Sequence, residues 1–222
     1  MAKRFKHHHP YPPYIPDGTT KLIVGTLPPP RFSQGLLKDG DVDFCYGSVD
    51  GQLWKILAGV FDIELEVNDI EKAKIQRERL LIQHKIGICD MVEYCYREKI
   101  DASDLGIQDP VFRPIISILQ EHKSVDTLLF TGGNSKNGPE YFFRKHLKEY
   151  PEIVLKLIQD QVPRIYEFKL DNRTIRTVSL TAPSGSANRA IGSMQAYKEM
   201  KNKNPQFTTI DFRIMQYKPY FL

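Results

Sequence analysis

Three kinds of side chain in this sequence would together hold a flat ring beside a phosphate group. Asp90 follows a short apolar run, and its carboxylate accepts hydrogen bonds from N–H groups. Tyr46 and Phe44 carry aromatic faces, and stacking one planar base on such a face is worth about 1 to 3 kcal/mol. The stretch 184–186 reads Ser-Gly-Ser before a predicted helix, where hydroxyls and backbone N–H groups suit phosphate oxygens. The alternatives are core packing for the aromatics, a turn cap for Asp90 and an ordinary helix cap for the serines.

The elements that must position these side chains alternate between strands and helices. Apolar or alternating runs predict buried strands at 21–26, 86–92, 125–131 and 173–180. Caps, prolines and the apolar period predict helices at 52–61, 68–84, 110–119, 139–150, 151–159 and 187–201. Residues 201–222 are expected to form a final strand and tail. This alternation predicts an α/β chain with a mainly parallel sheet that is covered on both faces.

The carboxyl ends of parallel strands are where such sheets bind ligands. In this sequence those ends are expected at 25–33, 90, 132–134 and 181–188. We therefore expect the polar and aromatic side chains named above to meet along one edge of the sheet.

The start of the chain differs in composition from the rest. Residues 1–16 are predicted to be a basic, proline-rich arm, extended and either packed by its tyrosines or disordered, and 17–222 a single domain. The tract His7–His9 suits metal binding or plain solvation. The net charge is +4, and residues 164–222 hold ten Lys and Arg against four Asp and Glu. Such asymmetry suits a polyanionic partner, or is an ordinary set of solvated lysines.

The composition excludes several classes of protein. No apolar run approaches the roughly 18 to 20 residues that span a bilayer, and the start of the chain does not resemble a signal peptide. A cytoplasmic protein is expected, or a nuclear one if the source has a nucleus. Cys45, Cys89 and Cys95 cannot all pair and lack the spacing of zinc or iron–sulfur ligands, so reduced thiols and no metal cluster are expected.

Five groups of residues follow one another in an order that resembles the uracil-DNA glycosylase superfamily, with its hypoxanthine-DNA glycosylase branch the closest match. They are 22–29 (LIVGTLPP), 44–47 (FCYG) with 52–57 (QLWKIL), 88–95 (ICDMVEYC), 129–134 (LFTGGN) and 181–188 (TAPSGSAN). The resemblance covers about residues 10–197. It implies a three-layer α/β/α domain with a central four-stranded parallel sheet. It also implies a monomeric enzyme that hydrolyses the N-glycosidic bond of uracil or hypoxanthine in DNA, without metal or cofactor.

The resemblance also implies a role for individual residues. An enzyme of this kind flips the target nucleotide out of the duplex, at a cost of a few kcal/mol. The residues implied to bind the base are Gly25, Thr26, Leu27, Pro28, Phe44, Tyr46 and Asp90. Tyr46 or Phe44 would stack on the base, and Asp90, with a pKa raised by burial, would read its hydrogen-bonding edge. The residues implied to bind the DNA backbone are Ser33, Asn134, Ser184, Gly185, Ser186, Asn188 and Arg189. Trp54 is assigned to the core.

The catalytic position departs from the family pattern. Superfamily enzymes commonly place an Asp or Asn just after the first glycine, where this chain has Thr26. The hypoxanthine branch draws its Asn from a later block, where this chain has Gly51. The neighbouring Asp50 is therefore predicted to orient water and to stabilise the developing sugar cation, with Gln52 as a weaker substitute. Asp50-Gly51 also suits a plain turn.

Two other functions remain open on the sequence alone. One is a DNA-binding module that has lost catalysis together with the missing Asn, and the other is an enzyme that acts on free nucleosides or nucleotides. Salt separates them, because phosphate contacts release counterions and DNA binding weakens steeply as salt rises.

Overall fold

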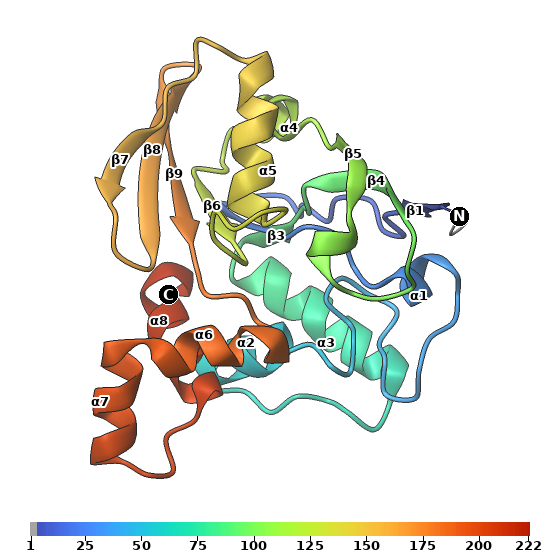
Figure 1. Cartoon of the computed structure of the whole chain (residues 1–222), viewed down its shortest axis with the longest axis vertical. Coiled ribbons are helices and arrows are strands. Elements are labelled where there is room, and N and C mark those ends of the chain that lie inside the picture. The colour runs from blue at the N-terminus through green and yellow to red at the C-terminus, as the bar shows by residue number, and fades with distance from the viewer. Residues whose placement is uncertain (1–3) are drawn as a thin grey trace.

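The computed structural model describes residues 4–222, in which a six-stranded sheet lies between two groups of helices (Figure 1). The strand order is β3-β2-β6-β9-β8-β7. The strands are β2 (Lys21–Val24), β3 (Ile86–Ile88), β6 (Thr127–Phe130), β7 (Lys156–Gln159), β8 (Arg164–Leu170) and β9 (Arg173–Ser179). The first four in this order are parallel neighbours, whereas β8 and β7 continue the sheet antiparallel. The predicted α/β class and mainly parallel sheet are confirmed, but the sheet has six strands instead of the expected four.

Alternate residues of the central strands face two separate hydrophobic cores. Leu22 and Val24 of β2 belong to one core, whereas Ile23 between them belongs to the other. The first core lies under α4 (Ile115–Glu121) and α5 (Pro139–His146). The second lies under α2 (Leu53–Phe61), α3 (Ile70–Gln83) and α8 (Thr209–Phe221). Burial on both faces explains why the central strands are apolar runs rather than alternating ones. The expected core position of Trp54 is confirmed, since only 4% of it is exposed.

A smaller antiparallel sheet holds the predicted N-terminal arm. Its strands are β1 (Phe5–His8), β4 (Val92–Arg97) and β5 (Gln108–Phe112), in the order β1-β4-β5. Tyr14 then forms a bridge with Ile88 at the end of β3. Of the two alternatives for the arm, the structure thus shows the packed one for residues 4–16. Met1–Lys3 lie outside the described residues.

The remaining helices are short. They are α1 (Pro30–Ser33), α6 (Asn188–Ser193) and α7 (Gln195–Lys203), with single 3-10 turns η1 (Asp104–Gly106), η2 (Leu147–Glu149) and η3 (Gly185–Ala187). The helix expected over 187–201 is therefore interrupted at Met194, whose backbone is extended. Within residues 4–222, no helix is both long and apolar enough to cross a bilayer.

Two predicted elements have the wrong bounds, and two others are wrong. The strand expected at 86–92 ends at Ile88, and Val92 already belongs to β4 of the smaller sheet. The helix expected at 110–119 begins only at Ile115, because Gln108–Phe112 form β5.

The helix expected at 151–159 is instead a turn followed by the edge strand β7, which pairs with the unpredicted β8. The strand and tail expected at 201–222 are the end of α7 and the helix α8, which Thr208 and Asp211 cap reciprocally. The second error was avoidable, because Ile210, Ile214, Tyr217 and Phe221 repeat at helical spacing and pack against the second core.

Candidate functional site

The point where the sheet reverses its strand order marks the candidate site. From β2 the chain goes to β3 on one side and later to β6 on the other side. Connections therefore diverge beyond the carboxyl end of β2, and open α/β sheets bind ligands in such places. Gly25 and Asp90 follow β2 and β3 there, as the sequence predicts. Thr131, expected as the last residue of its strand, directly follows β6.

Asp90 is the centre of a buried hydrogen-bonded cluster at this point. Its Oδ1 accepts a hydrogen bond from the Gly25 backbone N–H at 2.9 Å and from the Tyr46 hydroxyl at 2.9 Å. Its Oδ2 lies 3.1 Å from Nε2 of His9. The Tyr46 hydroxyl also lies 3.2 Å from Oγ1 of Thr131. We call these five residues the Asp90 cluster.

The cluster holds Asp90 as a charged carboxylate, which corrects the sequence-based expectation of a raised pKa. Burial raises the pKa of Asp90, but the hydrogen bonds from His9 and Tyr46 and the nearby Arg113 outweigh it, so the pKa is lower than usual. Nδ1 of His9 accepts the Tyr11 backbone N–H, so the ring carries its proton on Nε2 and donates it to Asp90. Asp90 therefore accepts three hydrogen bonds and donates none.

Gly25 allows Tyr46 to reach the carboxylate. A Cβ atom at Gly25 would collide with the Tyr46 hydroxyl and lie 2.8 Å from Oδ1 of Asp90. Tyr46 itself has a left-handed backbone, with φ of 56°, which turns its side chain toward the strand ends. Burial first, and then Asp90, raises the pKa of this phenol, so the hydroxyl remains a donor. The predicted base-binding residues Gly25, Tyr46 and Asp90 thus lie together, but they contact one another directly and leave no room for a base between them.

The other predicted base-binding residues are divided between core and surface. Phe44 packs against Trp54 and Tyr14 and is only 6% exposed, so its core alternative holds. Leu27 is likewise buried, in the first core. Pro28 is partly exposed. Thr26 is partly exposed as well, and its hydroxyl donates to a carboxyl that sequence reasoning missed.

That carboxyl is Asp104 in η1. Its Oδ1 accepts the Thr26 hydroxyl at 2.7 Å, and burial raises its pKa to about 6. Asn137 fixes the turn by donating to the carbonyl oxygens of Asp104 and Ile107, and buried Arg97 donates to that of Ser103. Asp104 therefore supplies a carboxyl next to the first glycine, the place where the sequence itself has only Thr26. No local motif around 104 signals this role.

Asp50, the predicted catalytic residue, lies apart from the Asp90 cluster. Its side chain is 68% exposed and forms an ion pair with Lys38 at 3.2 Å and a longer one with Arg31 at 3.8 Å. Its neighbour Gly51 pairs with Ser184, which brings the 181–188 loop beside the start of α2. Gln52 directly precedes α2, and its buried side-chain oxygen has no hydrogen-bond partner within residues 4–222.

The 181–188 loop is held in place by α8. Fully buried Arg213 donates to the carbonyl oxygens of Ala182 and Ser184 and to Oδ1 of Asn188. Gln216 accepts hydrogen bonds from the backbone and hydroxyl of Thr181. These contacts leave Gly185, Ser186 and Arg189 exposed, whereas the Asn188 side chain is already engaged. The segment with no predicted function thus positions the predicted DNA-binding loop.

Two further predicted contacts with DNA lie on other loops. Ser33 is exposed, and its hydroxyl donates to the carbonyl oxygen of His8. Asn134 is exposed in the loop after β6.

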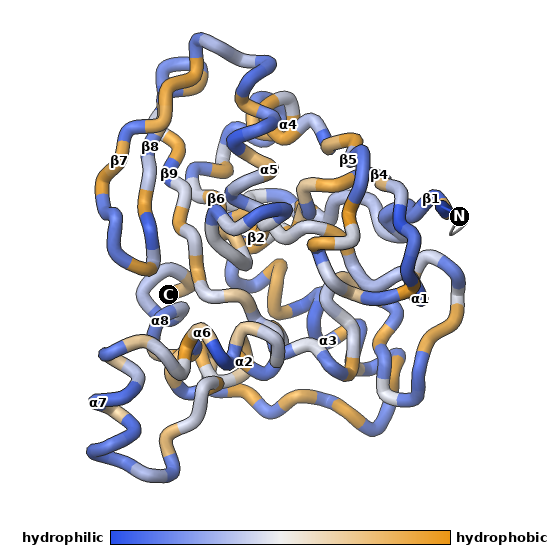
Figure 2. The backbone as a smooth tube through the Cα atoms, viewed as in Figure 1, coloured by the Kyte–Doolittle hydropathy of each residue, from blue (hydrophilic) through white to orange (hydrophobic). Residues whose placement is uncertain are grey.

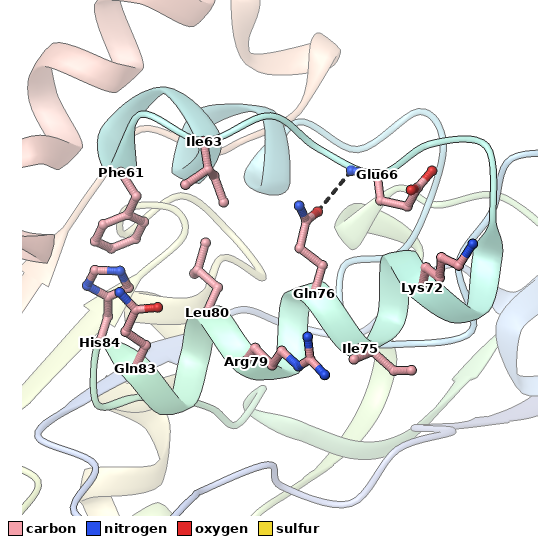
Figure 3. Close-up of a pocket in the computed structure, with 10 residues that line it drawn as sticks. All are labelled: Phe61, Ile63, Glu66, Lys72, Ile75, Gln76, Arg79, Leu80, Gln83 and His84. Atoms are coloured by element: carbon pink, nitrogen blue, oxygen red, sulfur yellow. Dashed lines mark hydrogen bonds between the residues drawn. The ribbon is translucent and has the colours of Figure 1, made fainter.

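Two cavities lie beside α3. The larger, of about 580 Å³, is a groove between α3 and the segment that follows α2, and it contains none of the predicted site residues (Figure 3). The smaller, of about 260 Å³, is lined by Tyr46 and Gly51 together with Trp54 and Arg77. Tyr46 therefore belongs both to the Asp90 cluster and to the wall of this second cavity.

Comparisons with known proteins identify no relative of this chain. Neither a scan against protein-family models nor searches of curated proteins and of solved structures found a match to this chain. The family resemblance therefore remains a prediction from the motifs.

Proposed function

We propose that this protein is a DNA N-glycosylase that hydrolyses the bond between a deaminated base, uracil or hypoxanthine, and its sugar. The observation that carries the proposal is the convergence of Gly25, Tyr46, Asp90 and Thr131 at the reversal point of the sheet, in the order that the motifs predict. The two cores on opposite faces of the sheet favour the three-layer arrangement that the resemblance implies.

The 181–188 loop and the start of α6 support DNA as the partner. They offer exposed hydroxyl, backbone and guanidinium groups at Gly185, Ser186 and Arg189, on a segment that buried Arg213 fixes. Such groups contact phosphate oxygens without reading the sequence. Because the loop is already ordered before DNA binds, it loses less conformational entropy on binding. We expect a monomer to bind in this way.

Asp104 is better placed than Asp50 to activate water in this proposal. A general base works best when its pKa lies near the working pH, and burial gives Asp104 a pKa of about 6. Asp104 contacts Thr26 directly after the first glycine, whereas Asp50 is exposed and paired with Lys38. In the proposed reaction the Asp104 carboxylate accepts a proton from water, the water oxygen bonds to the sugar carbon, and the base leaves with the bonding electrons.

A catalytically inactive DNA-binding module is the second candidate. It is favoured by the hydrogen bonds of Asp90, because the carboxylate that would read the base already accepts three of them from the protein. Catalysis requires Tyr46 to move or the base to bind beside it.

Single-turnover assays with excess protein test both candidates. The substrates are duplex and single-stranded oligonucleotides that contain uracil, hypoxanthine or xanthine, with alkali to cleave abasic sites. We expect base release by the wild type, a loss of 10²-fold or more in Asp104→Asn, and little change in the control Asp50→Asn. A large loss in Asp50→Asn alone would restore the sequence-based assignment. Salt-sensitive binding without release of any base would replace the enzyme with the binding module.

A further inference from the structure

The smaller cavity beside α3 is lined by two basic side chains, Lys55 and Arg77, and one of them has a buried donor that makes no hydrogen bond within residues 4–222. Arg77 of α3 lines this cavity opposite the 40–51 loop, and its guanidinium carbon lies 5.2 Å from the centre of the Trp54 ring. Nη1 of Arg77 is buried and has no hydrogen-bond partner within residues 4–222. Burial lowers the pKa of Arg77 to about 10, so the group is still charged at neutral pH.

The one carboxylate that lines this cavity is engaged elsewhere. Oε1 of Glu66 accepts hydrogen bonds from the backbone N–H groups of Asn68 and Asp69. A buried N–H group without an acceptor costs free energy, and an acceptor supplied by a ligand would recover part of that cost. The arrangement therefore calls for a ligand that carries hydrogen-bond acceptors.

The walls of the cavity specify the rest of the ligand. The apolar residues that line it are Val42, Val49, Leu65, Val67, Ile70 and Ala73. The segment after α2 that contributes Leu65 and Val67 runs along the bottom of the view, with hydrophobic and polar residues interspersed (Figure 2). The Trp54 indole N–H already donates to the carbonyl oxygen of Cys45, so Trp54 offers its ring rather than a donor. A volume of about 260 Å³ equals roughly nine water molecules, which is room for a small ring.

We propose that this cavity binds a planar heterocycle with exocyclic carbonyl oxygens, which accept hydrogen bonds from Arg77 while the ring lies against the Trp54 and Tyr46 walls. This inference rests on the proposed function, because such a ring is the base to be released. It transfers recognition of the base from Asp90, which accepts three hydrogen bonds already, to Arg77, which has donors to spare. Guanidinium donors favour oxo bases over amino bases, since an amino group at the same place offers no acceptor.

Trp54 gives a direct measurement of binding, because it is the single tryptophan of the chain. The full chain is titrated with free hypoxanthine, xanthine and uracil, and Trp54 fluorescence is followed with excitation near the red edge of its absorption. We expect saturable quenching by the oxo bases and binding at least tenfold weaker for adenine. Arg77→Gln should weaken hypoxanthine binding at least tenfold, and Arg77→Lys, which keeps the charge, should weaken it less.

Arg79→Gln is the matched control. Arg79 lies on the same helix but lines the larger groove, as Figure 3 shows, and it is exposed. It should bind hypoxanthine as the wild type does. Circular dichroism confirms that each variant is folded, and Asp104→Asn should retain wild-type binding because it lies outside this cavity.

Three results would overturn the proposal: no saturable quenching by any oxo base, equal losses in Arg77→Gln and Arg79→Gln, or equal binding of adenine and hypoxanthine. Saturation by inorganic phosphate in place of the rings would overturn it as well, since that would identify a simple anion site. The proposed function fails separately. Binding of oxo bases without release from DNA keeps the cavity assignment and refutes the glycosylase, whereas release unaffected by Arg77→Gln does the reverse.

Discussion

The Asp90 cluster and the smaller cavity, which we call the Arg77 cavity, share Tyr46. They differ in whether the chain itself supplies hydrogen-bond partners to the charged side chain. Asp90 accepts hydrogen bonds from three donors within the protein and itself lines neither of the two cavities. Arg77 lines the smaller cavity, and its buried Nη1 has no hydrogen-bond partner within residues 4–222. The carboxylate whose hydrogen bonds are made within the chain fixes the geometry of the strand ends, whereas the proposal gives the unpaired donor of Arg77, which borders a cavity, to a ligand. The difference predicts opposite responses to mutation.

Asp90→Ala should have the largest effect on stability. It leaves the Gly25 amide and Nε2 of His9 without an acceptor and the Tyr46 hydroxyl with only Thr131, and removing one side of a buried charged interaction typically costs about 3 to 5 kcal/mol. Urea unfolding measures the loss. Asp43→Ala is the control, because Asp43 is exposed and accepts one hydrogen bond from Tyr11. Equal losses in the two variants would mean that the Asp90 cluster is not a structural centre.

Tyr46→Phe should cost less, because it removes one of the three donors to Asp90. A hydrogen bond to a charged group contributes about 1.5 to 3 kcal/mol. The same variant keeps the aromatic wall of the Arg77 cavity, so hypoxanthine binding should not change. A stable Tyr46→Phe protein that no longer binds hypoxanthine would reverse the roles assigned to the two regions.

Asp104 and Asp90 lie at the same edge of the sheet, but their pKa values are shifted in opposite directions. The pKa of Asp104 is about 6 in the folded protein, above its ordinary value of 3.8. Its protonated form therefore favours folding fully below about pH 3.8, and this contribution is lost as the pH rises through 6. Asp104→Asn removes that loss, so its melting temperature relative to the wild type should be higher at pH 8 than at pH 4.

The sign is opposite for Asp90. Its lowered pKa stabilises the fold at neutral pH, and that stability is lost only in acid, as the pH falls through the lowered value. Asp90→Asn should therefore flatten the acid side of the stability profile. A parallel pH dependence in the two Asn variants would contradict the geometry.

Arg77→Met should have the smallest effect on stability. Arg77 is partly buried, and its Nη1 has no hydrogen-bond partner within residues 4–222. An apolar side chain of similar length removes this unpaired donor, so a change within about 1 kcal/mol is expected. Urea unfolding checks this, and hypoxanthine binding should be lost in the same protein. A destabilisation above about 3 kcal/mol would show that Arg77 is structural after all.

The sequence predicts the sheet well because the central strands are buried on both faces. Continuous apolar runs such as 21–24 and 127–130 leave few other interpretations, and each ends at a polar or glycine residue of the candidate site. The edge strand β7 lacks that signal, since Leu157 and Ile158 are half exposed, and its neighbour β8 is only partly buried along most of its length. Motif order identified Gly25, Tyr46 and Asp90, which lie together.

Contacts that depend on distant parts of the chain could not be predicted. His9 reaches Asp90 only because β1 pairs with β4, and Asp104 reaches Thr26 only because Asn137 and Arg97 fix its turn. In the sequence, Arg77 resembles any surface arginine of a polar helix, and only the structure shows that its guanidinium lies over the Trp54 ring. Asp50 was favoured by its neighbours in the sequence, yet its side chain turns outward to Lys38.

The Asp90 cluster also has a consequence for the order of folding. Its members come from positions 9, 25, 46, 90 and 131, so none of its side-chain hydrogen bonds can form by local chain closure. Contacts between distant segments require loops to close first, which makes them slow to form. The pairing of four-residue β1 at the edge of its sheet is then among the steps that complete the site. In hydrogen-exchange terms, the Gly25 amide, which donates to Oδ1 of Asp90, is expected to exchange only when the ends of β2 and β3 separate.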